Sequence, residues 1–436
     1  MTVQKYIHGT SSVNIARSIE EAVAGGRIAA GALLPPVRAL AEQLQVAPAT
    51  VASVYRQLQS RGLLVSEGRR GTRVRPAAPV SLPPDAAIPD GVVNLAAGNP
   101  DPALLPPLPS LKTEQRLYGD YLNEPELMAL AREQFEADGI RAEYVAVVGG
   151  ALDGIERVLR EHLRPGDRVL VEDPAFTGIL DLLNALSLIA VPVPVDDEGV
   201  LAQPLRRAAK NAQALIVTPR AQNPTGAAFS PRRARELRAA LTAFPELLVI
   251  EDDHAGPIAG TPYVSLIDRT RARWAVVRSV SKSLGPDLRL AVMASDAHTH
   301  ARVDGRQRLG IRWVSHILQN LVVALWRDRK TATHLARASR TYTARRDALI
   351  AALAQHGIAS HGASGLNVWI PVAEEAAVVQ SLMAAGWAVK AGERYRIATP
   401  PAIRVTTATL TPADAMRFAA DLAGIVRRRG GVTLTV

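Results

Sequence analysis

Three successive segments in the first 75 residues have the hydrophobic spacing of helices. The first can begin at Ser11 or Ser12, which suit an N-cap, and Gly25-Gly26 ends it. A second segment follows, and the third starts at Pro48, which suits the first turn of a helix. Residues 62–75, GLLVSEGRRGTRVR, then predict two short strands around a Gly-Arg-Arg-Gly turn. Together these elements predict a winged helix-turn-helix.

Residues 76–92, PAAPVSLPPDAAIPDGV, contain five prolines and little hydrophobic periodicity, which is typical of an extended connector. The chain is also too long for one ordinary core. We therefore predict a first domain over residues 1–75, a proline-rich linker over 76–92 and a larger part over 93–436. Within that part we expect a large domain over 93–320 and a small domain over 321–436.

From residue 93 onward, short apolar runs rich in β-branched residues alternate with helical patterns. This alternation predicts an α/β domain with a mainly parallel sheet. The candidate strands are YVAVVGG, RVLVEDP, IAVPVPV, ALIVTPR, LLVIEDD and WAVVRSV. Polar residues follow several of these runs. Ligands of open α/β sheets bind at the carboxyl ends of the strands, so we expect these polar residues to converge there.

Three of these polar residues are evenly spaced along the chain. Asp252 follows Asn223 by 29 positions and Lys282 follows Asp252 by 30, each matching one β-α-β step. Taken alone, Asn223 fits a plain turn, Asp252 fits a cap of the next element, and Lys282 fits a surface lysine or a general base. Together they fit pyridoxal 5′-phosphate, whose aldehyde needs a lysine amine and whose ring nitrogen needs a carboxylate.

The phosphate of such a cofactor needs hydroxyls, an arginine and the free N–H groups at the start of a helix. Ser279, Ser281 and Arg289 surround Lys282 in the chain, and Gly-Gly-Ala151-Leu152 opens a predicted helix. Glycines between a strand and a helix are also routine turn chemistry. Phe176 can stack on a flat ring, although a single aromatic side chain is more often part of a core.

Composition and charge add limits to this picture. The chain is 48% hydrophobic and 21% charged, and it has no cysteine, which excludes disulfides, thiolate chemistry and zinc-cysteine sites. No signal peptide or membrane span is evident, so we expect a soluble, cytoplasmic protein. Residues 1–75 carry ten Lys or Arg and four Asp or Glu, a net +6 of the total +10. This favours a nucleic-acid partner, against a solvated basic face or a protein-interaction module.

The stretch LLPPVRALAEQLQVAPATVASVYRQLQSRGLL, followed by GRRGTRV, resembles the GntR family of bacterial regulators. The resemblance implies binding to a double-stranded DNA operator, with the third helix in the major groove. Relatives often have polar or basic residues where this chain has Ala47, Pro48 and Ala49, so we expect phosphate contacts and the wing to matter more here. The residues that the resemblance implies near DNA are Arg38, Thr50, Tyr55, Arg69, Arg70, Gly71 and Thr72.

The motifs EDPAF, NPTG, EDDHA, SVSKSLGPDLRLA and IRVTTATL resemble fold-type I aminotransferases from about residue 93 to the end. The resemblance implies that Lys282 holds pyridoxal phosphate as a Schiff base, that Asp252 pairs with its ring nitrogen, and that Asn223 bonds its ring hydroxyl. It further implies that Phe176 stacks on the ring. Phosphate would be bound by Ser279, Ser281, Arg289 and the backbone amides of Ala151 and Leu152.

Three further roles follow from the same resemblance. Arg404 would take a substrate α-carboxylate, and Tyr118 would reach the site of a partner subunit. His254 stands where relatives often have a tyrosine that contacts the ring hydroxyl, so the tuning of a bound cofactor is expected to differ.

A GntR-type winged helix joined to an aminotransferase-like domain resembles the MocR subfamily of regulators, and TPRAQNPTG, EDDHA and RWVSHILQ resemble its PtsJ-type branch. The resemblance implies a transcription factor of vitamin B6 metabolism that uses pyridoxal phosphate as its effector and forms a head-to-tail homodimer. The alternative is a catalytically active, pyridoxal-phosphate-dependent aminotransferase with an accessory N-terminal domain.

Overall fold

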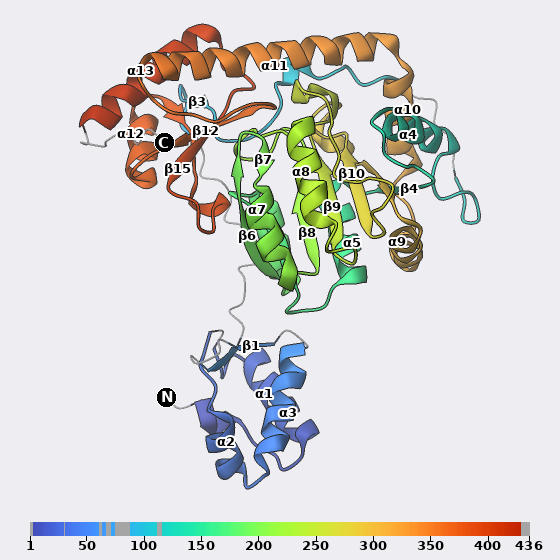
Figure 1. The fold of residues 1–436 in the computed structure, drawn as a ribbon, viewed down its shortest axis with the longest axis vertical. Coiled ribbons are helices and arrows are strands. Elements are labelled where there is room, and N and C mark those ends of the chain that lie inside the picture. Colours follow the sequence, from blue (N-terminus) through green and yellow to red (C-terminus); the bar gives the residue numbers. More distant parts are fainter. Residues whose placement is uncertain are drawn as a thin grey trace. The chain divides into compact units, whose positions relative to one another are not determined.

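A computed structural model of the chain describes residues 3–29, 31–60, 63–66, 71–74, 88–110 and 116–428. The described residues up to 74 fall in one compact unit and most of the described residues from 88 onward in a second (Figure 1). Within the described residues, no helix is both long enough and apolar enough to cross a membrane.

The described part of the N-terminal unit contains three α-helices and an antiparallel pair of strands, as the hydrophobic spacing predicts, together with a short 3-10 helix. Ser11 is the N-cap of the first helix, since its Oγ accepts a hydrogen bond from the Asn14 N–H at 3.2 Å. The two strands pair antiparallel, with Leu64 opposite Val74. The elements are η1 (Val3–Tyr6), α1 (Ser12–Ala24), α2 (Val37–Leu44), α3 (Pro48–Ser60), β1 (Leu64–Ser66) and β2 (Thr72–Val74).

The second unit is built on a large sheet with the strand order β4-β11-β10-β9-β8-β5-β6-β7. β5, β8, β9 and β10 run parallel, as expected, and their buried residues are mostly Val, Leu and Ile. β11 pairs antiparallel with both β10 and β4, so the sheet is mixed. Its strands are β4 (Tyr144–Val148), β5 (Arg168–Asp173), β6 (Ile189–Asp196), β7 (Gly199–Val200), β8 (Ala214–Val217), β9 (Leu248–Asp253), β10 (Trp274–Ser279) and β11 (Ala291–Ser295).

The two spacings of 29 and 30 residues in the sequence have different structural origins. β8 reaches β9 through a helix, α8 (Pro231–Leu241), as a β-α-β step requires. β9 reaches β10 through a short 3-10 helix, η5 (Gly256–Ala259), and irregular chain, so the second expected helix is absent from this fully described segment. The next connection, from β10 to β11, joins antiparallel neighbours and carries Lys282. The chain closes this loop at its base, where the Val280 N–H donates to the Leu290 carbonyl at 3.2 Å.

Helices cover the sheet, and Figure 1 shows α11 running as one unbroken helix from α10 to α13. The remaining helices of this part are α4 (Pro125–Ala137), α5 (Ala151–His162), α6 (Thr177–Ala185), α7 (Ala202–Ala208), α9 (Ala297–Leu309), α10 (His316–Arg327) and α11 (Arg329–Gln355).

A smaller subdomain follows, in which α12 (Glu375–Ala384) and α13 (Pro412–Arg428) accompany a sheet of β12 (Asn367–Pro371), β15 (Ala402–Thr406) and β14 (Lys390–Ala391). A separate parallel pair joins β13 (Trp387–Ala388) to β3 (Val93–Asn94), so the segment just after the predicted linker belongs with this subdomain.

Two apolar cores meet within α11. Leu335, Ala338 and Tyr342 belong to the core of the large sheet, whereas Leu349 and Leu353 belong to the core of the small subdomain. The change of core therefore lies well after residue 320, where the sequence suggested the boundary.

Candidate functional site

Lys282 lies at the carboxyl end of β10, in the loop that leads to β11. Its Nζ donates a hydrogen bond to the Gly98 carbonyl at 2.7 Å. Burial, followed by the positive charge of Arg404, lowers the pKa of the Lys282 amine to about 8. This amine therefore loses its proton more readily near neutral pH than an ordinary lysine does, which favours a nucleophilic role.

Arg404 comes from β15 of the small subdomain and meets Asn223 from the loop after β8. Its Nη1 donates to the Asn223 Oδ1 at 3.3 Å, and its Nη2 donates to the Ala96 carbonyl. The guanidinium also lies over the Tyr395 ring, with its Cζ 5.1 Å from the ring centroid. Strands of the large sheet, the small subdomain and the segment around residue 97 thus bring their polar groups together at one place.

Asp252 is the penultimate residue of β9 and is 5% exposed. Its Oδ1 is buried and has no hydrogen-bond partner among the described residues. Burial, and then the neighbouring charge of Asp253, raises the pKa of Asp252 to about 7. Burial and the charge of Lys282 lower the pKa of His254 to about 4, so His254 is neutral at pH 7. A buried carboxyl without a partner is costly, and a ligand N–H would satisfy it.

The Arg289 guanidinium lies beside the start of α5, an arrangement that suits an anion. Gly150 has a φ of +115°, and a Cβ at this position would lie 3.3 Å from the Arg289 Nη2. Arg289 is exposed, and it lies at the far end of the Lys282 loop, after Ser279 and Ser281. The Ser279 Oγ donates to the Ser281 Oγ at 3.1 Å and accepts from the Ser281 N–H at 3.2 Å. Helix-terminal amides, an arginine and hydroxyls are the groups that bind phosphate.

Phe176 is half-buried beside the same helix start. A Cβ on Gly178 would lie 2.6 Å from the Phe176 ring and 3.1 Å from the Leu152 Cδ1, so these two side chains flank one another. Tyr118 is elsewhere on the surface and is 82% exposed. Its ring packs edge-on against Trp313 at 5.7 Å and lies under Arg312.

Among the residues expected at DNA, Arg38 is exposed on α2, Thr50 is half-buried in the first turn of α3, and Gly71 and Thr72 are half-buried at β2. Arg69 and Arg70 lie outside the described residues.

Tyr55 differs from the expectation. It is 3% exposed, and its hydroxyl donates to the Pro35 carbonyl at 2.8 Å. Its side chain therefore packs α3 against the turn before α2, and a direct contact with DNA is not available to it in this structure.

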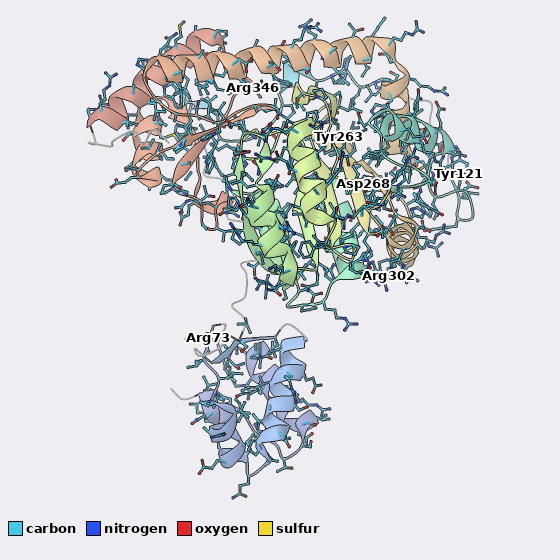
Figure 2. All side chains as sticks on the ribbon, in the orientation of Figure 1. Arg73, Tyr121, Tyr263, Asp268, Arg302 and Arg346 are labelled. Atoms are coloured by element: carbon cyan, nitrogen blue, oxygen red, sulfur yellow. The ribbon has the colours of Figure 1, made fainter. Side chains whose placement is uncertain are left out.

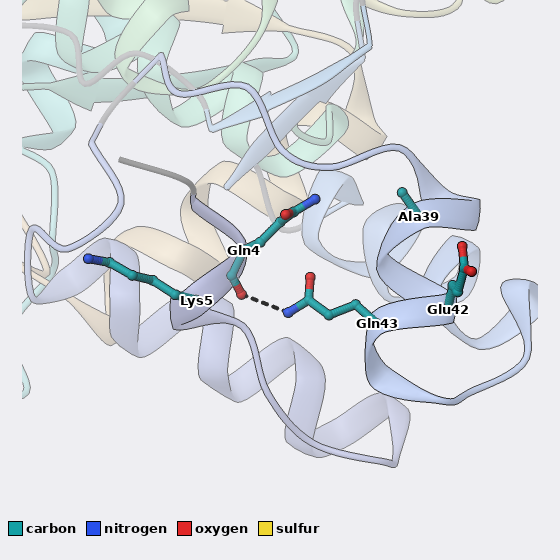
Figure 3. A pocket seen from close by; sticks show the side chains of 5 residues that line it. All are labelled: Gln4, Lys5, Ala39, Glu42 and Gln43. Atoms are coloured by element: carbon teal, nitrogen blue, oxygen red, sulfur yellow. Dashed lines mark hydrogen bonds between the residues drawn. The ribbon is translucent and has the colours of Figure 1, made fainter.

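An open hollow in the N-terminal unit lies between η1 and α2 (Figure 3). Gln43 Nε2 donates to the Gln4 carbonyl at 3.0 Å across it, and Lys5, Ala39 and Glu42 line the rest. The hydrogen bond joins the two elements, and the hollow is too open to enclose a small molecule.

The sequence did not predict the backbone groups of residues 93–101 that contact the site. The Ala96 and Gly98 carbonyls accept from Arg404 and Lys282, and backbone groups leave no signature in a pattern of side chains. It also missed Asp173, whose carboxylate accepts from the N–H groups of Ile397, Ala398 and Thr399 at 2.8–3.0 Å. This carboxylate fastens a loop of the small subdomain to the end of β5.

The described residues fit pyridoxal phosphate by three independent features. The unpartnered Asp252 oxygen suits a ring N–H, the glycine-lined start of α5 with Arg289 suits a phosphate, and Lys282 has a lowered amine pKa.

Comparison with protein-family models finds two matches. Residues 11–74 match "Bacterial regulatory proteins, gntR family", and residues 90–422 match "Aminotransferase class I and II".

Among curated proteins, the chain is 40% identical to the vitamin B6 salvage pathway transcriptional repressor PtsJ of Salmonella typhimurium over 427 residues, covering 95% of this chain and 98% of the relative. It is 28% identical to the HTH-type transcriptional regulator TauR of Rhodobacter capsulatus, covering 82% and 83%. Among solved structures, it matches a kynurenine aminotransferase of Pyrococcus horikoshii with a TM-score of 0.70 at 19% identity, covering 78% of this chain and 91% of that one.

Proposed function

The chain belongs to the MocR-type regulators, which join a gntR-family helix-turn-helix domain to a class I and II aminotransferase domain, and from this premise we propose that it is a DNA-binding transcriptional regulator that responds to pyridoxal 5′-phosphate. The observation that carries the proposal is the site around Lys282, in a chain that also has a DNA-binding domain. Because PtsJ is named a repressor of vitamin B6 salvage, we further propose repression of genes of vitamin B6 metabolism.

In this proposal each residue of the site has a defined task. Lys282 holds the cofactor covalently, Asp252 keeps its ring nitrogen protonated, and Asn223 binds its ring hydroxyl. Arg289, Ser279, Ser281 and the amides of Ala151 and Leu152 hold its phosphate. When bound, pyridoxal phosphate supplies an aldehyde that captures amines and a ring that withdraws electrons.

The remaining tasks belong to side chains at the edges of the site. Phe176 packs against the face of the ring, and His254, neutral at pH 7, lies near Lys282 without adding charge. Arg404 is reserved for the carboxylate of an amino compound that enters the site.

The Gly98 contact supports a response of the chain to the cofactor. The Lys282 amine donates to the Gly98 carbonyl, and Gly98 lies shortly after the predicted linker to the DNA-binding domain. An amine occupied by a ligand no longer makes this hydrogen bond, so occupancy of the site changes the contacts of the segment that leads to the linker. The ligand then binds with different free energies to the chain with the Lys282–Gly98 hydrogen bond and to the chain without it. Such a difference is what a regulatory ligand requires.

We also propose a head-to-tail homodimer that acts in the cytoplasm. Support for the dimer comes from the exposed Tyr118 and its apolar neighbours Leu117 and Ile311, which a monomer would leave in water. Two copies would present two helix-turn-helix domains to a DNA site with two halves. Of the DNA contacts, Arg38 and the wing residues Arg69 to Thr72 are those we propose to touch DNA.

The test is a DNA-shift titration of the region upstream of neighbouring genes, with and without pyridoxal phosphate. We expect the cofactor to change the affinity of the wild-type chain about fivefold or more, and to leave Lys282→Ala unchanged. Lys210→Ala, an exposed lysine on the same unit, is the matched control and should behave as wild type. Equal DNA affinity with and without cofactor in the wild type would contradict the proposal.

An active aminotransferase is the second candidate, favoured by Arg404 lying beside Asn223 next to the reactive lysine. Sustained release of a keto acid from an amino acid, lost in Lys282→Ala, would support it. Binding of DNA without such turnover would favour the regulator.

A further inference from the structure

A second cavity of about 640 Å³ lies in the large unit, among α4, β10, η5, α10 and α11. Lys282, Asp252 and Asn223 do not line it, whereas Ser279, which the proposed function assigns to the cofactor phosphate, does. Its lining includes a polar group of residues, Asp138, Arg220 and Arg278, called the polar wall below, and an apolar group, Leu325, Trp326 and Leu335. A partly open cavity with an apolar lining and a few polar groups is typical of a small-molecule site.

The polar wall favours an anion. Arg220 and Arg278 are both buried, and the only acid that lines the cavity within the described residues is Asp138. Asp253 lies behind the two arginines and binds both, accepting from the Arg220 Nε at 2.8 Å and from the Arg278 Nε at 2.7 Å. The residues that line the cavity therefore include two guanidinium groups and one carboxylate, and with the ionised Asp253 behind them the four-residue cluster is neutral as a whole.

The two guanidinium groups keep donor capacity for a ligand. Arg220 uses its three nitrogens to bond Asp253 and the Thr261 carbonyl, and Arg278 uses its three to bond Asp253, Asp138 and the Gln134 carbonyl. A guanidinium has five N–H groups, so each arginine retains N–H groups beyond these bonds. The ring of Tyr263, labelled in Figure 2, supports both from one side, with Cζ-to-centroid distances of 5.1 and 5.2 Å.

The segments that form the polar wall also carry the cofactor site. Arg220 precedes Asn223 by three residues in the loop after β8, and Asp253 directly follows Asp252 on β9. Arg278 and Ser283 flank Lys282 on either side of the loop after β10. Because successive residues of a strand point to opposite faces, one set of strand ends presents Asp252 to one side and Asp253 to the other. Any shift of these segments is shared by both sites.

We propose that this cavity is a second ligand site for a small organic anion, a carboxylate or a phosphate ester on a compact apolar body, and that its occupancy is coupled to the Lys282 site. The coupling rests on the proposed function of that site, whereas the binding does not. A purely structural role is the alternative, in which the Asp138–Arg278–Asp253–Arg220 cluster only fastens α4 to the sheet.

Calorimetry of small anions binding to the full-length chain distinguishes a ligand site from a purely structural cluster. The probes are 3-phenylpropionate and phenyl phosphate, which differ in the source of the negative charge, and the uncharged 3-phenylpropanol. Ala336→Trp fills the cavity from an exposed position of α11 and leaves the charged cluster intact. Ser339→Trp fills it from a second position, and Ala344→Trp, exposed on α11 but outside the cavity, is the matched control.

We expect at least one anionic probe to bind the wild type once per chain, and 3-phenylpropanol not to bind. Ala336→Trp and Ser339→Trp should weaken this binding about tenfold or more, about 1.4 kcal/mol, and Ala344→Trp should not. If neither anion binds, if the alcohol binds as well as the anions, or if all three variants bind alike, the site does not exist as proposed.

Coupling is measured by titrating pyridoxal phosphate, followed by its absorbance, at saturating probe. We expect a change of about fivefold in its dissociation constant in the wild type and in Ala344→Trp, but none in Ala336→Trp. An unchanged constant in the wild type overturns the coupling. Probe binding is measured directly by calorimetry and needs neither the cofactor nor DNA. A chain that fails to bind pyridoxal phosphate or DNA would therefore contradict the proposed function, while the probe measurement would still test the cavity.

Discussion

Asp252 and Asp253 are neighbours in the chain, both are buried, and their carboxyls have opposite tendencies. Two arginines donate to Asp253, and their positive charges outweigh its burial and lower its pKa to about 2. Asp252 has no such partner, and its burial, with the charge of Asp253, raises its pKa to about 7. The same degree of burial therefore yields a permanent anion on one face of β9 and a carboxyl that binds a proton readily on the other.

Replacing Asp252 by Asn should change how the stability of the cofactor-free chain depends on pH. A raised folded-state pKa stabilises the fold below the unfolded pKa of about 4, and this contribution is lost as the pH rises through about 7. The free energy of unfolding of Asp252→Asn should thus equal that of the wild type near pH 4. At pH 8 it should be higher by a few kcal/mol, at about 1.4 kcal/mol for each unit of the pKa shift.

Urea unfolding between pH 4 and 8 measures this difference. The exposed Asp90→Asn is the control and should track the wild type throughout. Parallel curves for wild type and Asp252→Asn would show that Asp252 is not held in its protonated form by burial.

Removing the Tyr55 hydroxyl should weaken the N-terminal unit without altering DNA contacts. Tyr55→Phe leaves the Pro35 carbonyl without its donor, and we expect a loss of about 1–2 kcal/mol in unfolding free energy, seen as faster amide exchange in α2 and α3. Tyr6→Phe is the control for loss of a tyrosine hydroxyl. A drop in DNA affinity without any loss of stability would instead restore a contact between Tyr55 and DNA.

Among single residues, Lys282 and Asp252 could be predicted from the sequence because each stands at the carboxyl end of an apolar run, where polar side chains of neighbouring strands converge. It could not reveal that Tyr55 is buried, since an amphipathic helix offers a tyrosine both a core and a surface position. Nor could it reveal the Gly98 carbonyl, which depends on how the chain crosses the site.

Among the elements, the loop between η7 (Glu393–Tyr395) and β15 is held from both sides. Glu375 accepts from the N–H groups of Glu393 and Ala402, and Asp173 accepts from three N–H groups at residues 397–399. The first contact lies within the small subdomain, and the second ties that subdomain to β5. The Asp173 carboxylate is therefore one of the groups that hold the two subdomains together at the site, in addition to the hydrogen bond between Arg404 and Asn223.

Asp173→Ala should release this loop. Hydrogen bonds to a charged group contribute about 1.5–3 kcal/mol each, so amide exchange at residues 397–399 should accelerate by about tenfold or more. Asp268→Ala removes an aspartate that accepts backbone N–H groups in another loop (Figure 2), and it should accelerate exchange at Thr270 and Arg271 only. Unchanged exchange at 397–399 in Asp173→Ala would mean that other contacts hold the loop.

The parallel strands of the sheet were predictable because each is a short apolar run followed by polar residues. The apolar run of β11, Ala291–Ser295, is just as clear, but its direction is set by its partners β10 and β4 and not by its own residues. The missing helix between β9 and β10 has a similar cause, because an equal number of residues can cross the sheet as a helix or as irregular chain.

At the scale of the whole molecule, the most exposed apolar side chains among the described residues lie on two adjoining segments. Tyr118 and Leu309 are each 82% exposed, and Tyr118 contacts Arg312 and Trp313, which follow Leu309 closely in the chain. Single exposed apolar residues are common, whereas such a group is typical of an interface.

If the chain forms the proposed dimer through these segments, Leu309→Arg should shift it toward monomer, because the substitution places a charge in an apolar contact that must lose water. Sedimentation at several protein concentrations measures the shift, which we expect to raise the dissociation constant about tenfold or more. Met416→Arg, on an apolar residue of α13 that is 59% exposed, is the matched control. An equal effect of both substitutions, or of neither, would place the interface elsewhere.

Because it passes from one core into the other, α11 has the geometry of a lever. Tyr342 is its natural fulcrum, since this side chain is fully buried and its hydroxyl accepts from the Asp101 N–H at 3.1 Å. At a rise of 1.5 Å per residue, Ala336 lies about 9 Å from the fulcrum on one arm and Leu353 about 16 Å on the other. A tilt that carries the small subdomain in one direction would move the wall of the second cavity the opposite way, over about half the distance.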